Sequence, residues 1–152
     1  FINETVPYRA VAWLANKLYK ERYTAVPTKH GWRITPESKQ VDYYWKIKNN
    51  WNHIKAYATI EKEAMQPGGI EEFIFEHYYG YTKVSESHTE EYKVEHPRWN
   101  TNKINSVDIN CDFEAMYGKQ FSHLSGKAPS SVIMAEGSAI AVKWKREKLS
   151  FL

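Results

Sequence analysis

Apolar residues recur with the spacing of a helix in two stretches of the chain. The first stretch covers residues 7–21, and Pro7 suits its first turn. Its apolar stripe consists of Val11, Leu14, Ala15 and Leu18. The second begins near Gly69 and runs for about three turns to Gly80, a residue type that favours a left-handed helix end. Its stripe consists of Ile70, Phe73, Ile74 and His77. We expect both helices to bury these stripes against a sheet.

Alternation of apolar and polar residues marks the strands, because successive side chains of a strand point to opposite faces of its sheet. Residues 41–48 alternate in this way, Asn49 and Asn50 indicate a turn, and residues 54–60 alternate again. Residues 41–61 are therefore predicted to form an antiparallel hairpin. Further extended segments are predicted at residues 23–34, 91–96, 107–112, 132–136 and 139–144, and a short helical turn at 113–117.

Together these elements predict an α+β fold. About seven strands and two substantial helices occur without the strand–helix–strand repeat of a parallel sheet. We expect the strands to pair antiparallel in one strongly bent, partly closed sheet, with the two main helices packed on it. Residues 1–152, of which 42% are hydrophobic, are enough for a single domain with a core of its own.

Charge and cysteine content narrow the choice of partners and compartment. The net charge of +3 comes from 21 basic and 18 acidic residues mixed along the chain, so we expect neither nucleic-acid nor membrane binding. No apolar run reaches the roughly 20 residues that a membrane span needs. Cys111 is the only cysteine, which excludes an internal disulfide and fits a reducing, cytoplasmic location.

Several segments spread along the chain resemble the bacterial YqjF-like family of uncharacterised proteins. They are Phe1–Pro7, Tyr19–Tyr23, Glu72–Thr82, Glu95–Trp99 and Ala135–Ser138. The resemblance covers nearly the whole chain. Members of that family are longer at the N-terminus, which implies that Phe1 begins inside the domain and that N-terminal strands are missing before it. The sheet edge where those strands belong could pair with a second copy, so a homodimer is one expectation.

The YqjF-like family is similar to the acetoacetate decarboxylase superfamily. This resemblance implies a curved, barrel-like antiparallel sheet around a central pocket. The decarboxylases carry a lysine that forms a Schiff base, and the position that matches it in this chain is Tyr23, whose phenol cannot form an imine. Lys20 and Lys29 are nearby amines, but a catalytic lysine needs burial or a neighbouring cation to lower its pKa. We therefore expect Lys20 to face solvent and expect no decarboxylase activity.

Metal and cofactor chemistry finds little support in the sequence. His77 and His96, with Glu76 and Glu95 beside them, could bind a metal through two imidazoles and a carboxylate. Their spacing matches no compact ligand motif. The alternative is that His77 has a structural role and donates a hydrogen bond to a backbone carbonyl of its helix. The sequence contains no phosphate-binding loop, dinucleotide fingerprint or serine-hydrolase elbow. We therefore expect no metal and no cofactor.

The candidate ligand-binding residues are polar groups expected on the hollow side of the bent sheet. They are Tyr23, Tyr79, Tyr81, His96, Arg98 and Glu136. Pro97 should end a strand where His96 points inward, and Arg98 falls on the same side if the chain stays extended. Tyr79 and Tyr81 could close over this position and bring phenol donors beside the cation.

These side chains are compatible with two functions, and with a third possibility in which they serve only to stabilise the fold. A small-molecule-binding domain would hold a carboxylate or keto compound in a central pocket, with Arg98 as its anion clamp. An enzyme of the lyase or hydrolase type would add His96 or Glu136 as acid and base. Alternatively, the side chains form a buried network in which Glu136 neutralises Arg98. The missing lysine favours the binding domain over an enzyme.

Overall fold

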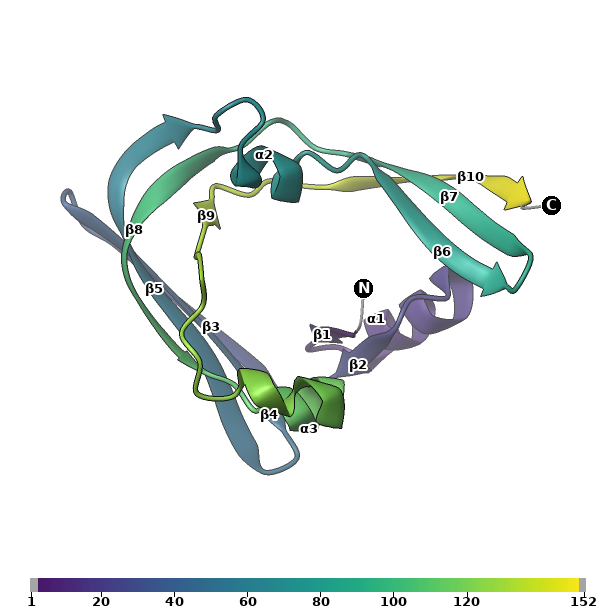
Figure 1. The fold of residues 1–152 in the computed structure, drawn as a ribbon, viewed down its shortest axis with the longest axis horizontal. Coiled ribbons are helices and arrows are strands. Elements are labelled where there is room, and N and C mark those ends of the chain that lie inside the picture. The colour runs from purple at the N-terminus through teal and green to yellow at the C-terminus, as the bar shows by residue number, and fades with distance from the viewer. Residues whose placement is uncertain (1–2, 151–152) are drawn as a thin grey trace. The chain divides into compact units, whose positions relative to one another are not determined.

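The computed structural model of the chain describes residues 3–150, with the backbone alone at residues 144–146 and 150 (Figure 1). The chain divides into two compact units. The first unit combines the residues up to 61 with residues 102–134, and the second combines residues 62–101 with those from 135 onward. Segments that lie far apart in the sequence therefore build each unit.

A parallel pair of short strands and a helix open the first unit. In chain order the elements are β1 (Glu4–Val6), α1 (Arg9–Leu14), a π-helical segment η1 (Ala15–Tyr19) and β2 (Tyr23–Ala25). β1 pairs with β2 in parallel, and the continuous helical stretch α1–η1 connects them. Lys20, at a left-handed φ of 55°, follows the last helical residue. The helix predicted at residues 7–21 is thus confirmed.

The apolar stripe of this helix is not buried, which corrects the sequence-based expectation. Val11, Leu14 and Leu18 are 45%, 44% and 48% exposed, whereas Ala12 is buried. α1 contacts both β1 and β2, and the small Ala12 is its buried residue. The expectation is wrong because periodicity identifies an apolar face without showing what covers it.

Consecutive antiparallel hairpins follow in the first unit. Their strands are β3 (Thr28–Ile34), β4 (Ser38–Ile47) and β5 (Asn50–Ala64). Lys48 and Asn49 form the tight turn between β4 and β5, and Lys48 takes a left-handed φ of 53° there. The hairpin predicted at residues 41–61 is confirmed, with Val41 paired to Ala56. Its turn begins one residue earlier than the predicted Asn49–Asn50 pair, because Asn50 already pairs with Ile47.

Two further strands complete a five-stranded sheet in the order β3-β4-β5-β8-β9. They are β8 (Asn100–Asn110) and β9 (Met134–Ala135). β5 and β8 run antiparallel, because the Asn102 side chain donates to the carbonyl of Glu61 while the Asn52 side chain accepts from the backbone N–H of Asp112. The buried apolar residues of the first unit include Val26, Val41, Trp45, Ala56 and Ala58.

A short capped helix follows β8. α3 (Phe113–Tyr117) begins after Asp112, whose carboxylate accepts a hydrogen bond from the Ala115 N–H at 2.9 Å. Gly118, at a φ of 104°, ends α3 as the sequence predicts, and a 3-10 helix, η2 (Lys119–Leu124), continues the chain. This capping fixes the position of Tyr117.

The second unit contains a three-stranded antiparallel sheet and one short helix. Its elements are α2 (Ile70–Phe75), β6 (Tyr79–Ser85), β7 (His88–Glu95) and β10 (Ala141–Ser150), with the strand order β10-β7-β6. The strand predicted at residues 91–96 is the end of β7, and Pro97 lies just beyond it. α2 begins after Gly69, as predicted, but its last residue is Phe75.

Gly80 lies inside β6 and does not end a helix, which corrects a second expectation. A side chain at this position would collide with the Tyr92 ring on β7, so the strand requires glycine. The stripe of α2 is also exposed, with Ile70 at 52% and Phe73 at 70%. A six-residue helix completes fewer than two turns, so it cannot present the long buried face that the periodicity predicts.

The α+β class with mainly antiparallel pairing is confirmed, but one continuous sheet is not. The described strands form a five-stranded sheet, a three-stranded sheet and the parallel β1–β2 pair, and no closed barrel is found among them. The single sheet is wrong because alternation shows which face of a strand is apolar and does not identify its partner. None of the described helices has the length and apolar character needed to cross a membrane.

Candidate functional site

Tyr23 is the predicted site residue that lies in the first unit. It opens β2, and the parallel register places it directly beside Glu4 of β1. Asn16 of η1 fixes its backbone, because the Asn16 side chain donates to the Tyr23 carbonyl at 2.8 Å and accepts from the Tyr23 N–H at 3.1 Å. The helical segment and the strand pair together hold Tyr23 in place.

Tyr23 lines an open pocket of about 410 Å³, which we name the Tyr23 pocket. Residues from η1, from β2 and its approach, and from α3 and η2 contribute to it. They include Asn16, Arg22, Tyr23, Met116, Tyr117 and Gln120. Small-molecule sites in proteins commonly enclose about 300–1,000 Å³, so this volume suits a small ligand.

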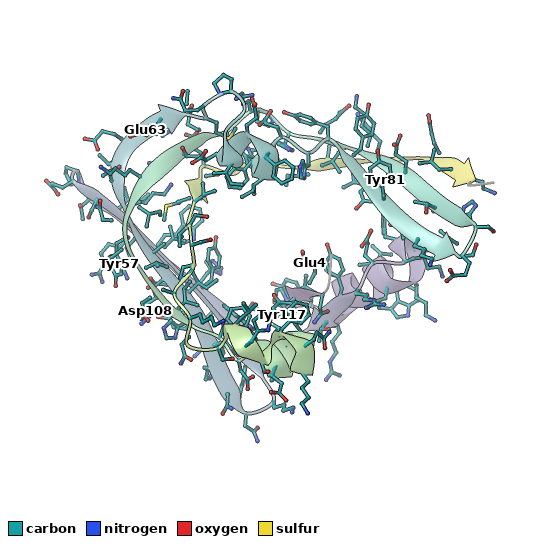
Figure 2. The ribbon with its side chains drawn as sticks, viewed as in Figure 1. Glu4, Tyr57, Glu63, Tyr81, Asp108 and Tyr117 are labelled. Carbon is teal, nitrogen blue, oxygen red and sulfur yellow. The ribbon has the colours of Figure 1, made fainter. Side chains whose placement is uncertain are left out.

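Burial raises the pKa values of three acidic groups around this pocket. At Glu4 burial is the largest cause, and the charge of Glu21 adds to it. Burial is also the largest cause at Tyr23 and Tyr117, where the charge of Glu4 contributes as well. Figure 2 labels Glu4 and Tyr117, which belong to β1 and α3 of this unit. The two phenols therefore remain protonated donors over the physiological pH range.

The same three groups share the absence of a polar partner among the residues that the structure describes. Within the described part of the chain, the hydroxyls of Tyr23 and Tyr117 and the carboxyl of Glu4 form no hydrogen bond or ion pair. The Tyr117 ring is positioned by Phe113 and Phe121, with centroids 6.3 and 5.8 Å away. These groups are only partly buried and are not among the fully buried polar atoms without partners, so they are accessible to a hydrogen-bonding ligand.

Neither candidate lysine supplies an amine to the Tyr23 pocket. Lys20 is exposed, as expected, and is not among the residues that line the pocket. The Lys29 ammonium lies 4.7 Å from the centroid of the Trp51 ring, on the β3–β4–β5 sheet. The pocket residues described above therefore offer phenols, amides and the Arg22 guanidinium, without a nucleophilic amine.

Arg98, in the second unit, is occupied by two carboxylates. Its Nη2 lies 2.6 Å from Glu72 Oε1, and its Nη1 lies 3.7 Å from Glu76 Oε2. The Tyr78 hydroxyl also donates to Glu76 Oε2, at 2.5 Å. The hydrogen bond with Glu72 raises the pKa of Arg98, while the Gly68 N–H and then Arg98 lower the pKa of Glu72. Two negative charges thus face one positive charge, which disfavours a further anion.

His96 is part of an aromatic stack in the second unit. Its ring lies between Tyr78 and Trp99, with centroid distances of 5.0 and 4.4 Å. Its Nδ1 donates to the carbonyl of Pro97 at 2.9 Å, so the ring position is fixed by both stacking and a hydrogen bond. The Trp99 indole N–H in turn donates to the Ser138 hydroxyl at 2.9 Å.

Glu136 is held by its own partners. It forms an ion pair with Lys62 and accepts hydrogen bonds from the backbone and side chain of Asn100, both at 3.1 Å. The hydrogen bond with Lys62, followed by that from the Asn100 backbone, lowers the pKa of Glu136. This carboxylate therefore connects the start of β8 to Lys62 and stays ionised at neutral pH.

Tyr79 and Tyr81 alternate with Gly80 on β6, so they share one face of the strand. They are 53% and 59% exposed, and Tyr81 is labelled in Figure 2. A hydrogen bond with Glu91, its cross-strand neighbour on β7, is the largest cause that raises the pKa of Tyr81. Both phenols thus lie on a strand surface of the second unit.

Family membership follows from a match that covers most of the sequence. Residues 1–139 match the family model DUF2071, which is described as an uncharacterized conserved protein. The chain belongs to the DUF2071 family. No curated protein and no solved structure gives a match. The expectation of an uncharacterised family is confirmed, and the acetoacetate decarboxylase-like relation stays a prediction.

In this DUF2071 chain the predicted site residues fall in both units. Tyr23 belongs to the first, and the other five, Tyr79, Tyr81, His96, Arg98 and Glu136, belong to the second. Among the described residues no hydrogen bond or ion pair joins Arg98 to Glu136. Glu72 and Glu76 neutralise Arg98 in its place.

Glu4, Arg22 and Tyr117 are the residues around the Tyr23 pocket that the sequence-based selection missed. Glu4 and Tyr117 are distant in sequence and carry no shared motif, so periodicity cannot connect them. Arg22 directly precedes Tyr23 in the sequence, so its choice as a candidate could have followed from that of Tyr23. Within the part of the chain that the structure describes, no three His, Cys, Asp or Glu side chains are grouped to hold a metal.

Proposed function

We propose that this chain is a small-molecule-binding domain whose ligand, a small carboxylate or keto compound, occupies the Tyr23 pocket. One observation carries the proposal: Tyr23 and Tyr117 line the same pocket, and their hydroxyls bond to no other described residue. Because their pKa values are raised, both hydroxyls stay protonated. A carbonyl or carboxylate oxygen is the acceptor that such donors require.

Arg22 supplies the positive charge in this proposal. It lines the Tyr23 pocket and forms no ion pair with a described residue. A guanidinium binds a carboxylate through two parallel N–H groups, which orients the ligand as well as attracting it. Arg98 was the expected clamp, but Glu72 and Glu76 already engage it, so Arg22 is the better candidate.

The pocket favours binding over decarboxylation. The resemblance to the acetoacetate decarboxylase-like superfamily implies that Tyr23 replaces the Schiff-base lysine, and Tyr23 lines a pocket. This placement supports a relation to that superfamily in which the ligand site is kept and the amine is replaced. The lyase or hydrolase alternative has less support, because His96 and Glu136 do not line the Tyr23 pocket and because Lys62 and Asn100 already engage Glu136.

Isothermal titration calorimetry with acetoacetate, pyruvate and acetate tests the proposal. A dissociation constant of about 1 mM corresponds to about −4 kcal/mol, which is a reasonable expectation for so small a ligand. A hydrogen bond to a charged group contributes about 1.5–3 kcal/mol. Tyr23→Phe and Arg22→Gln should therefore each weaken binding by about tenfold or more. Tyr8→Phe is the matched control, because Tyr8 is 69% exposed and does not line the pocket.

Two results would contradict the proposal. If binding survives both Tyr23→Phe and Arg22→Gln, the ligand binds outside the Tyr23 pocket. If none of the three compounds shows saturable binding, small carboxylates and keto compounds are excluded as ligands. Borohydride reduction with acetoacetate separates binding from Schiff-base catalysis. We expect no covalent adduct by mass spectrometry, since the pocket lining holds no lysine among the described residues.

A further inference from the structure

The β3–β4–β5 sheet of the first unit has one face that combines aromatic and basic side chains. Directly paired residues of antiparallel strands point to the same side, so the strand register sorts side chains by face. Lys29 pairs with Tyr44, and Lys46 pairs with Trp51. The aromatic and basic residues that define this aromatic-basic face are Lys29, Arg33, Tyr44, Lys46, Trp51 and Tyr57, and the same register also places Asp42, His53 and Lys55 on it.

These aromatic side chains are not part of the core. The buried residues Val41, Trp45 and Ala56 occupy the alternate positions of β4 and β5, on the other face of the sheet. Trp51 and Tyr57 are each 39% exposed. Figure 2 labels Tyr57 on β5 of this unit. The rings therefore offer surfaces on which a planar ligand can stack.

A hollow lies within the aromatic-basic face. It is open to solvent, has a volume of about 450 Å³ and is lined by residues that include Lys29, Gly31, Tyr44 and Trp51. A methyl group added at Gly31 would meet only Asp42, at 3.7 Å, so packing within the chain does not require the space. The Lys29 ammonium lies 4.7 Å from the centroid of the Trp51 ring, which puts a cation and an aromatic face side by side.

The positive charge of this face is available for a ligand. Lys29, Arg33 and Lys46 form no ion pair with a described residue. Of the acidic groups here, Asp108 is paired with Lys55 at 2.9 Å, whereas Asp42 accepts from the neutral Gln40 amide at 3.0 Å and has no cationic partner among the described residues. Three unpaired cations therefore face one unpaired carboxylate. The modest net charge of +3 for the whole chain hides this local excess of cations.

We propose that the aromatic-basic face binds single-stranded nucleic acid. The phosphates pair with Lys29, Arg33 and Lys46, and unpaired bases stack on the rings. Trp51 and Tyr57 are six positions apart on β5, a span of about 20 Å at about 3.4 Å per residue. This length accommodates more than one base. Single strands fit better than duplexes, because only unpaired bases expose the faces that stack on aromatic side chains.

Fluorescence anisotropy with a labelled oligothymidylate of about 12 nucleotides tests the proposal, since comparable surfaces cover about 4–16 nucleotides. We expect saturable binding to this strand and at least about tenfold weaker binding to a duplex of equal length. For single strands the logarithm of affinity falls with the logarithm of salt by about 0.7 per phosphate contact. Three cations should give a slope of about −2, and Lys46→Gln should reduce its size by about 0.7.

Substitutions of the rings separate stacking from charge. Stacking contributes about 1–3 kcal/mol per base, so Trp51→Leu and Tyr44→Ala should weaken binding by about 5- to 150-fold. Tyr43→Ala is the matched control, because Tyr43 directly precedes Tyr44 on β4, lies on the opposite face of the sheet and is 49% exposed. Thermal melting of each variant checks that it is folded. If Tyr44→Ala unfolds the protein, the binding of Trp51→Leu still tests the stacking, because Trp51 is exposed.

Several outcomes would overturn the proposal. They are no binding at low salt, equal affinity for the duplex, and equal losses in Tyr43→Ala and Tyr44→Ala. Heparin that competes while the ring substitutions have no effect would show that any polyanion binds. Thymidine monophosphate that binds as tightly as the oligonucleotide would show a nucleotide pocket and no strand-binding surface.

Discussion

Asn52→Ala should destabilise the first unit and disturb the Tyr23 pocket at the same time. Asn52 is 2% exposed, and its Oδ1 accepts a hydrogen bond from the Asp112 N–H at 2.7 Å. Its Nδ2 donates to the Trp45 carbonyl at 3.4 Å. Alanine would leave the partly buried Asp112 N–H without its partner, just where α3 begins, and α3 carries Tyr117.

The expected cost follows from the unsatisfied donor. A buried polar group left without its partner costs about 1–3 kcal/mol, and the second, longer hydrogen bond adds less. A loss of about 2 kcal/mol should lower the melting temperature by about 4–8 °C in a chain of this size.

Urea denaturation of the wild type, Asn52→Ala and Asn50→Ala measures this loss. Asn50 is exposed at the start of β5, so Asn50→Ala should change the free energy of unfolding by less than about 0.5 kcal/mol. Calorimetry with the same proteins should show weaker ligand binding for Asn52→Ala alone. The reasoning fails if Asn52→Ala is no less stable than Asn50→Ala.

Further predictions concern pH, thiol reactivity and strand packing. Burial raises the pKa of Glu4 above its ordinary 4.5, so its contribution to stability is present below that pH and is lost as the pH rises through the folded-state pKa. Melting curves should show Glu4→Gln stabilising the protein at about pH 7 and not in acid, and a pH-independent difference would refute this. Burial also raises the pKa of Cys111, so iodoacetamide should alkylate it more slowly than a cysteine peptide, and equal rates would contradict the assignment. Gly80→Ala should cost about 1–3 kcal/mol through collision with Tyr92, whereas Gly31→Ala should cost less than about 1 kcal/mol; equal shifts in urea denaturation would argue against the collision.

Local patterns predict the hairpin at residues 41–61 correctly for a physical reason. An alternation that continues through two strands, with a short turn at Asn49 between them, allows few registers that keep Val41 and Ala56 on the buried face. The helix over residues 7–21 is predicted equally well, because its apolar spacing extends over several turns. Both elements depend only on residues that are close in sequence.

Partners that are distant in sequence cannot be predicted in this way. The pairing of Glu4 with Tyr23 joins two three-residue strands that are too short to show a period. Likewise, Arg98 was assigned to an anion because its charge is visible in the sequence, whereas the carboxylates of Glu72 and Glu76 reach it only through the fold. The sequence alone therefore cannot distinguish a charged residue that binds a ligand from one that is neutralised by another side chain. The tertiary structure is needed to tell them apart.

Methionine methyl NMR tests the central claim most directly. The chain contains three methionines, and Met116 lines the Tyr23 pocket while Met65 and Met134 do not. Titration of ¹³C-methyl-methionine protein with acetoacetate should shift the Met116 signal along a saturable curve and leave the other two signals unchanged. Tyr23→Phe should shift that curve to about tenfold higher ligand concentration. A Met116 signal that does not respond, or three signals that move together, would contradict a ligand site in the Tyr23 pocket.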